Sequence, residues 1–236
     1  MTRNDGRFFD QLRPVDLFPK YLPLHPTSCL IKMGLTWVLC AASVEEKVPP
    51  FLIGKEQGWV TAEYSMMPAS SKQRTQRERQ NSGRSQEISR LIGRALRGAV
   101  DLSKLGQRTI IVDCDVLQAD GGTRTASITG GYVALVLAVQ ELMEKGLIDQ
   151  NPLGSAVAAV SAGIVAGQPM LDLDYSEDSH ADADLNVVMN EAGEMVEVQG
   201  TAEGRAFGEA ALQEMLFLAR KGIGELLEAQ RRVLGM

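Results

Sequence analysis

Residues 109–126 read Thr109-Ile-Ile-Val-Asp-Cys-Asp-Val-Leu-Gln-Ala-Asp-Gly-Gly-Thr-Arg-Thr-Ala126, and much of the fold can be worked out from them. Apolar side chains alternate along residues 109–117, which is typical of a strand with one buried face. Asp120-Gly121-Gly122 forms a turn. The apolar run 126–145, followed by Gly146, predicts a largely buried helix with a glycine C-cap. Strand, glycine turn and buried helix in succession indicate a fold that mixes both element types.

The sequence before this stretch predicts a hairpin, a loop and a helix. Residues 28–33 and 36–44 are rich in β-branched and apolar residues with a glycine between them, as in a β-hairpin. Prolines, glycines and polar residues interrupt 45–83, which predicts a long loop. Apolar residues then recur at helical spacing over 88–99, with Arg90, Arg94 and Arg97 on the opposite face.

The sequence after it predicts two strand pairs and a final helix. The first pair covers 156–165 and 169–174, the second covers 185–189 and 195–199, and the helix spans roughly 207–232. Together these elements predict an α+β architecture in two related halves, joined near residues 147–155.

Composition favours a globular intracellular chain. Of 236 residues, 44% are hydrophobic and 23% charged, which is ordinary for a soluble protein. No run of eighteen apolar residues occurs and the N-terminus is charged, so we expect neither a membrane partner nor a secretory signal. The three cysteines form no CxxC pair, which favours reduced thiols and a cytoplasmic location. Two isolated histidines argue against a histidine-rich zinc site.

The net charge of −6 hides two segments of opposite sign. Residues 69–97 hold eight basic residues against two acidic ones, which suits a polyanionic partner. Residues 171–197 hold nine carboxylates and no lysine or arginine, which suits divalent cations.

Two groups of residues are candidate anion ligands. Gly121 and Gly122 let the backbone approach an anion closely, the N–H groups of a helix start point at it, and Arg124 can bond two phosphate oxygens. A helix cap beside a surface arginine would give the same pattern. Arg84, near the start of the other helix, is either a second anion ligand or a solvated surface residue.

The acidic segment Asp172-Leu-Asp-Tyr-Ser-Glu-Asp178-Ser-His-Ala-Asp182-Ala-Asp184 is the third candidate. One or two carboxylates commonly hold Mg²⁺ against phosphate oxygens, although a solvated acidic loop has the same composition. The spacing does not fit an EF-hand. The chain also has neither a GxSxG elbow nor a P-loop.

Seven blocks of sequence carry a more specific pattern, and they are Gly58-Trp-Val-Thr-Ala-Glu-Tyr64, Gly83-Arg-Ser-Gln-Glu-Ile88, Leu91-Ile-Gly-Arg-Ala-Leu-Arg97, Asp113-Cys-Asp-Val-Leu-Gln-Ala-Asp-Gly-Gly-Thr-Arg-Thr-Ala-Ser-Ile-Thr129, Leu171-Asp-Leu-Asp-Tyr175, Glu177-Asp-Ser179 and Glu197-Val-Gln-Gly-Thr-Ala-Glu-Gly204. In this order they closely resemble the bacterial ribonuclease PH family. The resemblance runs from Asp5-Gly6-Arg7 to the C-terminal helix.

The resemblance implies a fold and an assembly. It implies one ribonuclease PH domain over 1–236, built from duplicated βαβα-like units of the ribosomal protein S5 domain 2 type. The N-terminal half, 10–141, would bind phosphate and RNA, and the C-terminal half, 155–226, would carry the acidic metal site. Such domains assemble as a homohexameric ring, a trimer of dimers.

The resemblance also implies an activity. The chain would be a phosphate-dependent nucleotidyltransferase, a 3′-to-5′ exoribonuclease that trims transfer RNA precursors and takes part in RNA processing. It would use inorganic phosphate as co-substrate and Mg²⁺ or Mn²⁺ as cofactor, release nucleoside 5′-diphosphates, and also run in reverse. The alternatives are a catalytically silent RNA-binding ring subunit and a metal-dependent hydrolytic exonuclease.

Finally, the resemblance assigns roles to residues. The phosphate ligands would be Arg84, Gly122, Thr123 and Arg124. Asp178 and Asp184 would bind the metal and act with Arg124 in catalysis, with Asp182 beside them. The RNA-binding residues would be Arg74, Arg77 and Arg79. The chain departs from the family at Trp37 and Ala69, where lysine and arginine are usual, so two positive charges are missing.

Overall fold

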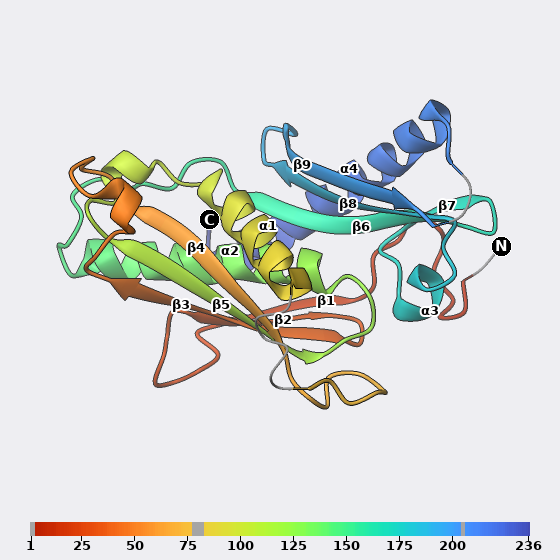
Figure 1. The fold of residues 1–236 in the computed structure, drawn as a ribbon, viewed down its shortest axis with the longest axis horizontal. Helices are drawn as coiled ribbons and strands as arrows, with labels where there is room; N and C mark the ends of the chain where they lie inside the picture. Colours follow the sequence, from red (N-terminus) through yellow and green to blue (C-terminus); the bar gives the residue numbers. More distant parts are fainter. Residues whose placement is uncertain (1–2, 77–82, 204–205) are drawn as a thin grey trace.

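The computed structural model describes residues 3–76, 83–203 and 206–236. Its first sheet has the strand order β1-β2-β3-β5-β4 (Figure 1). The strands are β1 (Val15–Pro19), β2 (Ser28–Met33), β3 (Thr36–Glu45), β4 (Trp59–Met66) and β5 (Thr109–Gln118). Neighbours pair antiparallel, except that β4 runs parallel to β5 and is joined to it through helix α1 (Gly83–Arg97).

The second sheet is antiparallel throughout, with the order β7-β6-β8-β9. Its strands are β6 (Val157–Val165), β7 (Gln168–Leu171), β8 (Ala183–Asn190) and β9 (Met195–Ala202). A short helix, α3 (Tyr175–Asp178), lies between β7 and β8. The long C-terminal helix α4 (Glu209–Leu234) packs against β6 and β7 and also reaches β1.

Helix α2 (Thr123–Glu144) forms the centre of the core because it packs against both sheets. It contacts β2 and β3 on one side and β6 on the other, and nearly every residue from Thr125 to Val139 is buried. A Cβ added at Gly130 would lie 2.7 Å from the Ile31 side chain, so this glycine lets the helix approach the sheet closely. α2 is also the one helix of the described chain that is long and apolar enough to cross a membrane, and its burial between the sheets accounts for that composition.

The expected loop over 45–83 is wrong in part, because β4 lies within it. Buried Val60, Ala62 and Tyr64 alternate with more exposed residues, but the run is short and follows a region rich in prolines and glycines. β4 is stabilised by parallel pairing with β5 and by α1 packing on it, and both contacts are distant in sequence. The addition of β4 completes a β4-α1-β5-α2 unit.

Smaller differences concern where elements begin and end. β1 was not expected. α2 begins at Thr123 rather than near residue 126, and β7 ends at Leu171 rather than 174. The acidic segment contains α3, whose start is closed by a capping box between Asp174 and Glu177. The other expected strands and helices are confirmed to within a few residues.

Candidate functional site

The turn after β5 presents free backbone N–H groups at the start of α2. Gly121 and Gly122 have φ angles of 76° and 65°, a left-handed conformation that favours glycine. We call residues 120–125 the phosphate loop. The Thr125 hydroxyl donates to the Gly122 carbonyl at 2.9 Å and so does not cap the helix. Within the described chain no acceptor binds the N–H groups of Thr123, Arg124 or Thr125. Such a helix start attracts anions.

Side chains from three other elements surround this loop. The Tyr64 hydroxyl, on β4, lies 2.8 Å from the Thr123 hydroxyl. Arg124 donates to the Gln199 side-chain oxygen on β9 at 2.8 Å, and Gln199 donates in turn to Glu87 on α1 at 2.8 Å. This chain of hydrogen bonds holds the Arg124 guanidinium in place without neutralising its charge at close range.

Arg84 and Arg124 lie at the starts of two helices, and the charges of both act on the Tyr64 hydroxyl. Burial raises the pKa of the Tyr64 hydroxyl, and the hydrogen bond to Thr123 and the charges of Arg84 and Arg124 oppose that rise. Both guanidinium groups therefore lie near this hydroxyl. Arg84 is exposed at the second position of α1. The geometry favours an anion site over two unrelated surface arginines.

The predicted carboxylates Asp178 and Asp184 lie close enough for the charge of Asp184 to act on Asp178. Asp178 ends α3 and Asp184 is the second residue of β8. Partial burial of the carboxylate raises the pKa of Asp178, although much of the residue is exposed, and the charge of Asp184 raises it further. The charges of Arg124 and Arg84 oppose both effects, which places the acidic pair next to the two arginines.

The carboxylate of Asp184 is in a similar environment. Burial raises its pKa, the charge of Arg124 lowers it, and the charge of Glu203 raises it. Asp182, which lies just before β8, is exposed. No group of three or more His, Cys, Asp or Glu side chains suited to a metal occurs in the described part of the chain. Two partly solvated carboxylates suit Mg²⁺, because this ion keeps several of its waters in protein sites.

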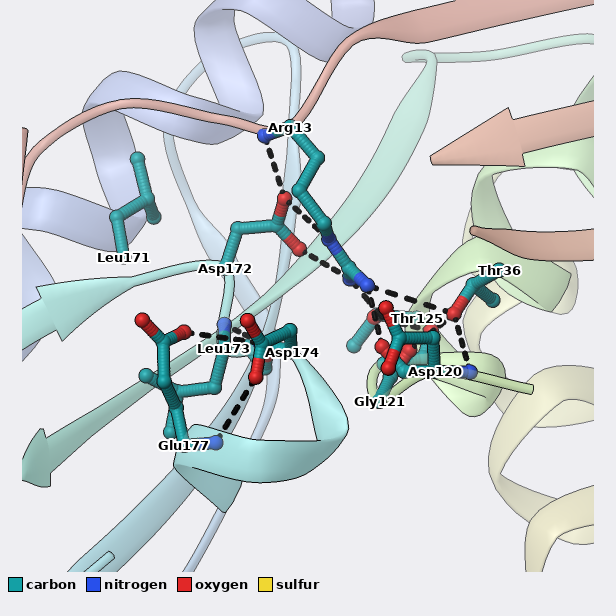
Figure 2. Close-up of polar contacts among 12 residues, drawn as sticks. Arg13, Thr36, Asp120, Gly121, Thr125, Leu171, Asp172, Leu173, Asp174 and Glu177 are labelled. Carbon is teal, nitrogen blue, oxygen red and sulfur yellow. Dashed lines mark hydrogen bonds and ion pairs between the residues drawn. The ribbon is translucent and has the colours of Figure 1, made fainter. Parts of the chain in front are cut away.

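A buried ion pair, Arg13–Asp172, joins the phosphate loop to the acidic segment (Figure 2). Arg13 donates to Asp172 through Nε at 3.0 Å and Nη2 at 2.6 Å, and also to the carbonyl oxygens of Asp120 and Gly121. Thr36 donates its hydroxyl to the Gly121 carbonyl at 2.6 Å. Sequence reasoning gave no role to Arg13 or Thr36 and placed Asp172 only in the acidic segment, because Arg13 and Asp172 are 159 positions apart and no local pattern joins them.

A second buried arginine, Arg3, also stabilises the acidic segment. Arg3 forms a buried two-pronged ion pair with Glu177 and also donates to the carbonyl oxygens of Leu171 and Asp172. Since Glu177 belongs to the capping box of α3, this pair fixes the short helix that ends at Asp178.

The structure tests the expected RNA-binding residues only in part. Arg74 is exposed, as such a role requires, whereas Arg77 and Arg79 lie outside the described residues. Trp37, at the first departure from the family, covers Lys32, whose ammonium lies 3.9 Å from the ring centroid.

Two models of the 3′ exoribonuclease family match the chain. Domain 1 of the family matches residues 11–141 and domain 2 matches residues 155–222. Ribonuclease PH of Neisseria gonorrhoeae is 56% identical over 234 residues, which cover 98% of this chain and 97% of that protein. Ribonuclease PH of Syntrophomonas wolfei is 54% identical over the full length of both chains.

Solved structures support the same fold at lower identity. A chain of the Archaeoglobus fulgidus exosome with RNA bound to the active site superposes with a TM-score of 0.81 at 24% identity, covering 96% of this chain and 92% of that one. Rice Rrp46 superposes with a TM-score of 0.79 at 19% identity, covering 98% of this chain and all of that one. The likeness of its sequence to both family domains and to bacterial relatives places this chain in the ribonuclease PH family of 3′ exoribonucleases.

Proposed function

We propose that the chain shortens RNA from its 3′ end with inorganic phosphate as attacking group and releases nucleoside 5′-diphosphates. The observation that carries this proposal is the meeting of two arginines and two carboxylates at the phosphate loop. Arg84 and Arg124 provide charge for the attacking phosphate, and the N–H groups at the start of α2 add donors. A hydrolytic enzyme has no need of a site for free phosphate.

The residues act on the reaction mainly through position and charge. Arg124, the Thr123 hydroxyl and the loop N–H groups hold phosphate in line with the last phosphodiester bond. A phosphate oxygen bonds to the phosphorus of the terminal nucleotide, the bond to the 3′ oxygen of the preceding nucleotide breaks, and that oxygen takes up the proton that phosphate releases. Arg84 and Arg124 offset the negative charge on the equatorial oxygens during the transfer. The reverse reaction adds nucleotides from diphosphates.

Asp178 and Asp184 are the residues that would hold Mg²⁺ or Mn²⁺, which supplies positive charge to the phosphate oxygens when bound. To hold the ion, the carboxyl groups of Asp178 and Asp184 must be ionised. The charges of Arg84 and Arg124 favour ionisation of Asp178, and that of Arg124 favours it at Asp184, against the burial that raises both pKa values.

The remaining assignments are also proposals. Transfer RNA precursors are the proposed substrates and the cytoplasm is the proposed location. The latter is supported by three buried cysteines that are all free thiols. The proposed assembly is a homohexameric ring, a trimer of dimers. Large apolar side chains exposed on the N-terminal part, such as Phe8, Phe18 and Leu24, support burial between copies.

The test is to incubate a short RNA with the purified protein and Mg²⁺, with and without millimolar phosphate, and to separate the nucleotides released. Diphosphates that form only with phosphate support the proposal. Monophosphates that form regardless of phosphate would mean hydrolysis. RNA binding without any product would identify a silent subunit, although retention of all four charged residues argues against that alternative.

A further inference from the structure

Arg13 contacts the carbonyl oxygens of the phosphate loop and is almost fully buried. Its guanidinium group holds both carboxylate oxygens of Asp172 on one side. On the other side it donates through Nη1 to the Asp120 carbonyl at 2.5 Å and through Nη2 to the Gly121 carbonyl at 3.4 Å (Figure 2). The backbone N–H of Arg13 also donates to Asp172, at 2.8 Å. One side chain therefore connects the acidic segment with two peptide groups of the loop.

The pair contributes orientation rather than net charge. Burial alone would lower the pKa of Arg13, but the carboxylate of Asp172 raises it above the usual range, so the guanidinium stays charged. The opposite charge of Asp172, at 2.6 Å, offsets that of Arg13, although the Arg13 charge still lowers the pKa of Asp178. Attraction of phosphate is therefore provided by Arg84 and Arg124, and Arg13 is left with a geometric task.

That task follows from the planarity of the peptide group. In a trans peptide the C=O and the following N–H point in opposite directions. The Gly121 carbonyl is held towards Arg13 and the Thr36 hydroxyl, so the N–H of Gly122 points away from both. The Thr36 hydroxyl also accepts from the Asp120 N–H at 2.9 Å. Successive N–H groups aimed at one point make an anion-binding concavity.

The loop also packs closely against the acidic segment. A Cβ added at Gly121 would lie 2.5 Å from the Leu173 carbonyl oxygen, so the segment that follows Asp172 supports the loop directly. The same segment continues into α3 and ends at Asp178. The phosphate loop and the acidic pair are thus held in register by Arg13, Asp172 and Thr36.

We infer that Arg13, Asp172 and Thr36 are positioning residues for the attacking phosphate: they aim the N–H groups of the loop at it and set their distance from the acidic pair. This inference rests on the proposed phosphorolysis. It predicts a selective effect, since weaker positioning of the loop should weaken the use of phosphate and leave RNA binding nearly unchanged.

The most informative variant is Thr36→Val, which keeps the size and β-branching of the side chain and removes only the hydroxyl. The matched control is Thr27→Val. Thr27, which lies just before β2, is also buried, and its hydroxyl donates to the Ala42 carbonyl at 2.7 Å. Arg13→Lys serves as a second variant, because lysine keeps the charge but cannot bridge Asp172 and the two carbonyls at once.

Initial rates of 3′ trimming are measured while phosphate and RNA are varied separately, together with thermal melting. Each hydrogen bond contributes about 0.5–1.5 kcal/mol, so loss of the bond from Thr36 to the Gly121 carbonyl alone should raise the KM for phosphate by roughly twofold to tenfold, and loss of the bond from the Asp120 N–H adds to this. The KM for RNA should stay within about twofold, and Thr27→Val should change melting alone. Arg13→Lys should raise the phosphate KM further.

Equal phosphate KM values for Thr36→Val, Thr27→Val and the unmodified chain would overturn the inference, as would a parallel change in both KM values. Thr36→Val decides the question even if Arg13→Lys does not fold. A wild-type rate that is independent of phosphate is a different failure, because it would overturn the proposed function itself.

Discussion

Replacement of Arg124 by alanine removes the one arginine that belongs to the phosphate loop itself. Its stability cost should be small, because Arg124 is partly exposed and its one described hydrogen bond is to Gln199. Loss of one such bond costs about 1 kcal/mol, and Gln199 keeps its bond to Glu87. The folded chain should therefore remain available for kinetic measurement.

The catalytic cost should be much larger. Removal of one donor that stabilises developing charge typically costs about 2.7–4 kcal/mol, or roughly 10²–10³ in rate. Arg124 also lowers the pKa of both Asp178 and Asp184. Without it, both carboxyl groups stay protonated to a higher pH, so the acid limb of the pH–rate profile should move to higher pH.

The assay is release of nucleoside diphosphate from a short RNA at several pH values, with thermal melting as a check on folding. Arg231→Ala is a suitable control, since Arg231 lies near the end of α4 and its ion pairs among the described residues are with the surface carboxylates of Glu191 and Glu228. A folded Arg124→Ala variant with a rate near normal, or with an unmoved acid limb, would refute the role assigned to Arg124.

Three further predictions concern Asp184, Gly121 and the expected RNA-binding arginines. Asp184→Asn should lower the rate at least about 100-fold, because Asp184 is a proposed ligand of an ion that would supply several kcal/mol of charge stabilisation. It should also raise the melting temperature at pH values above the raised pKa of Asp184. Burial raises this pKa, so the folded state loses stability as pH rises from the ordinary pKa through the raised one, and asparagine avoids that loss. An unchanged or lower melting temperature would contradict this. Gly121→Ala should reduce phosphate use more than RNA binding, because the φ of 76° and the close approach of Leu173 both disfavour a side chain; normal kinetics in phosphate titrations would be contrary to this expectation. RNA affinity, measured by fluorescence anisotropy, should fall as the salt concentration rises. The joint change of Arg74, Arg77 and Arg79 to alanine should reduce the slope of log affinity against log salt concentration by about 0.7 for each RNA phosphate that these arginines neutralise. Equal slopes for the variant and the unmodified chain would argue against their binding to RNA phosphates.

Elements with a strong local pattern could be predicted from the sequence. β5 shows alternating apolar residues, the glycine turn and the apolar run of α2 follow it directly in the chain, and α1 has a clear apolar stripe. β4 could not be predicted, because its stability depends on β5 and α1, which follow it in the chain.

The candidate site shows the same division between local and distant signals. The phosphate loop and the acidic segment could be recognised by residue type and spacing, and the family resemblance assigned roles to Arg84, Arg124, Asp178 and Asp184. That these four meet depends on the packing of the two sheets around α2. The ion pair between Arg13 and Asp172 could not be predicted, since no local pattern joins Arg13 to the acidic segment in which Asp172 lies.

The central claim is that inorganic phosphate attacks the RNA, and isotope transfer tests it most directly. A short RNA is digested with the protein in the presence of ³²P-labelled inorganic phosphate, and the nucleoside diphosphates are isolated and cleaved between their two phosphates. Phosphorolysis predicts that all of the label lies in the β-phosphate of the nucleoside diphosphates. Each nucleotide released should contain one phosphorus atom that comes from the inorganic phosphate. Nucleotides released without label would contradict the account.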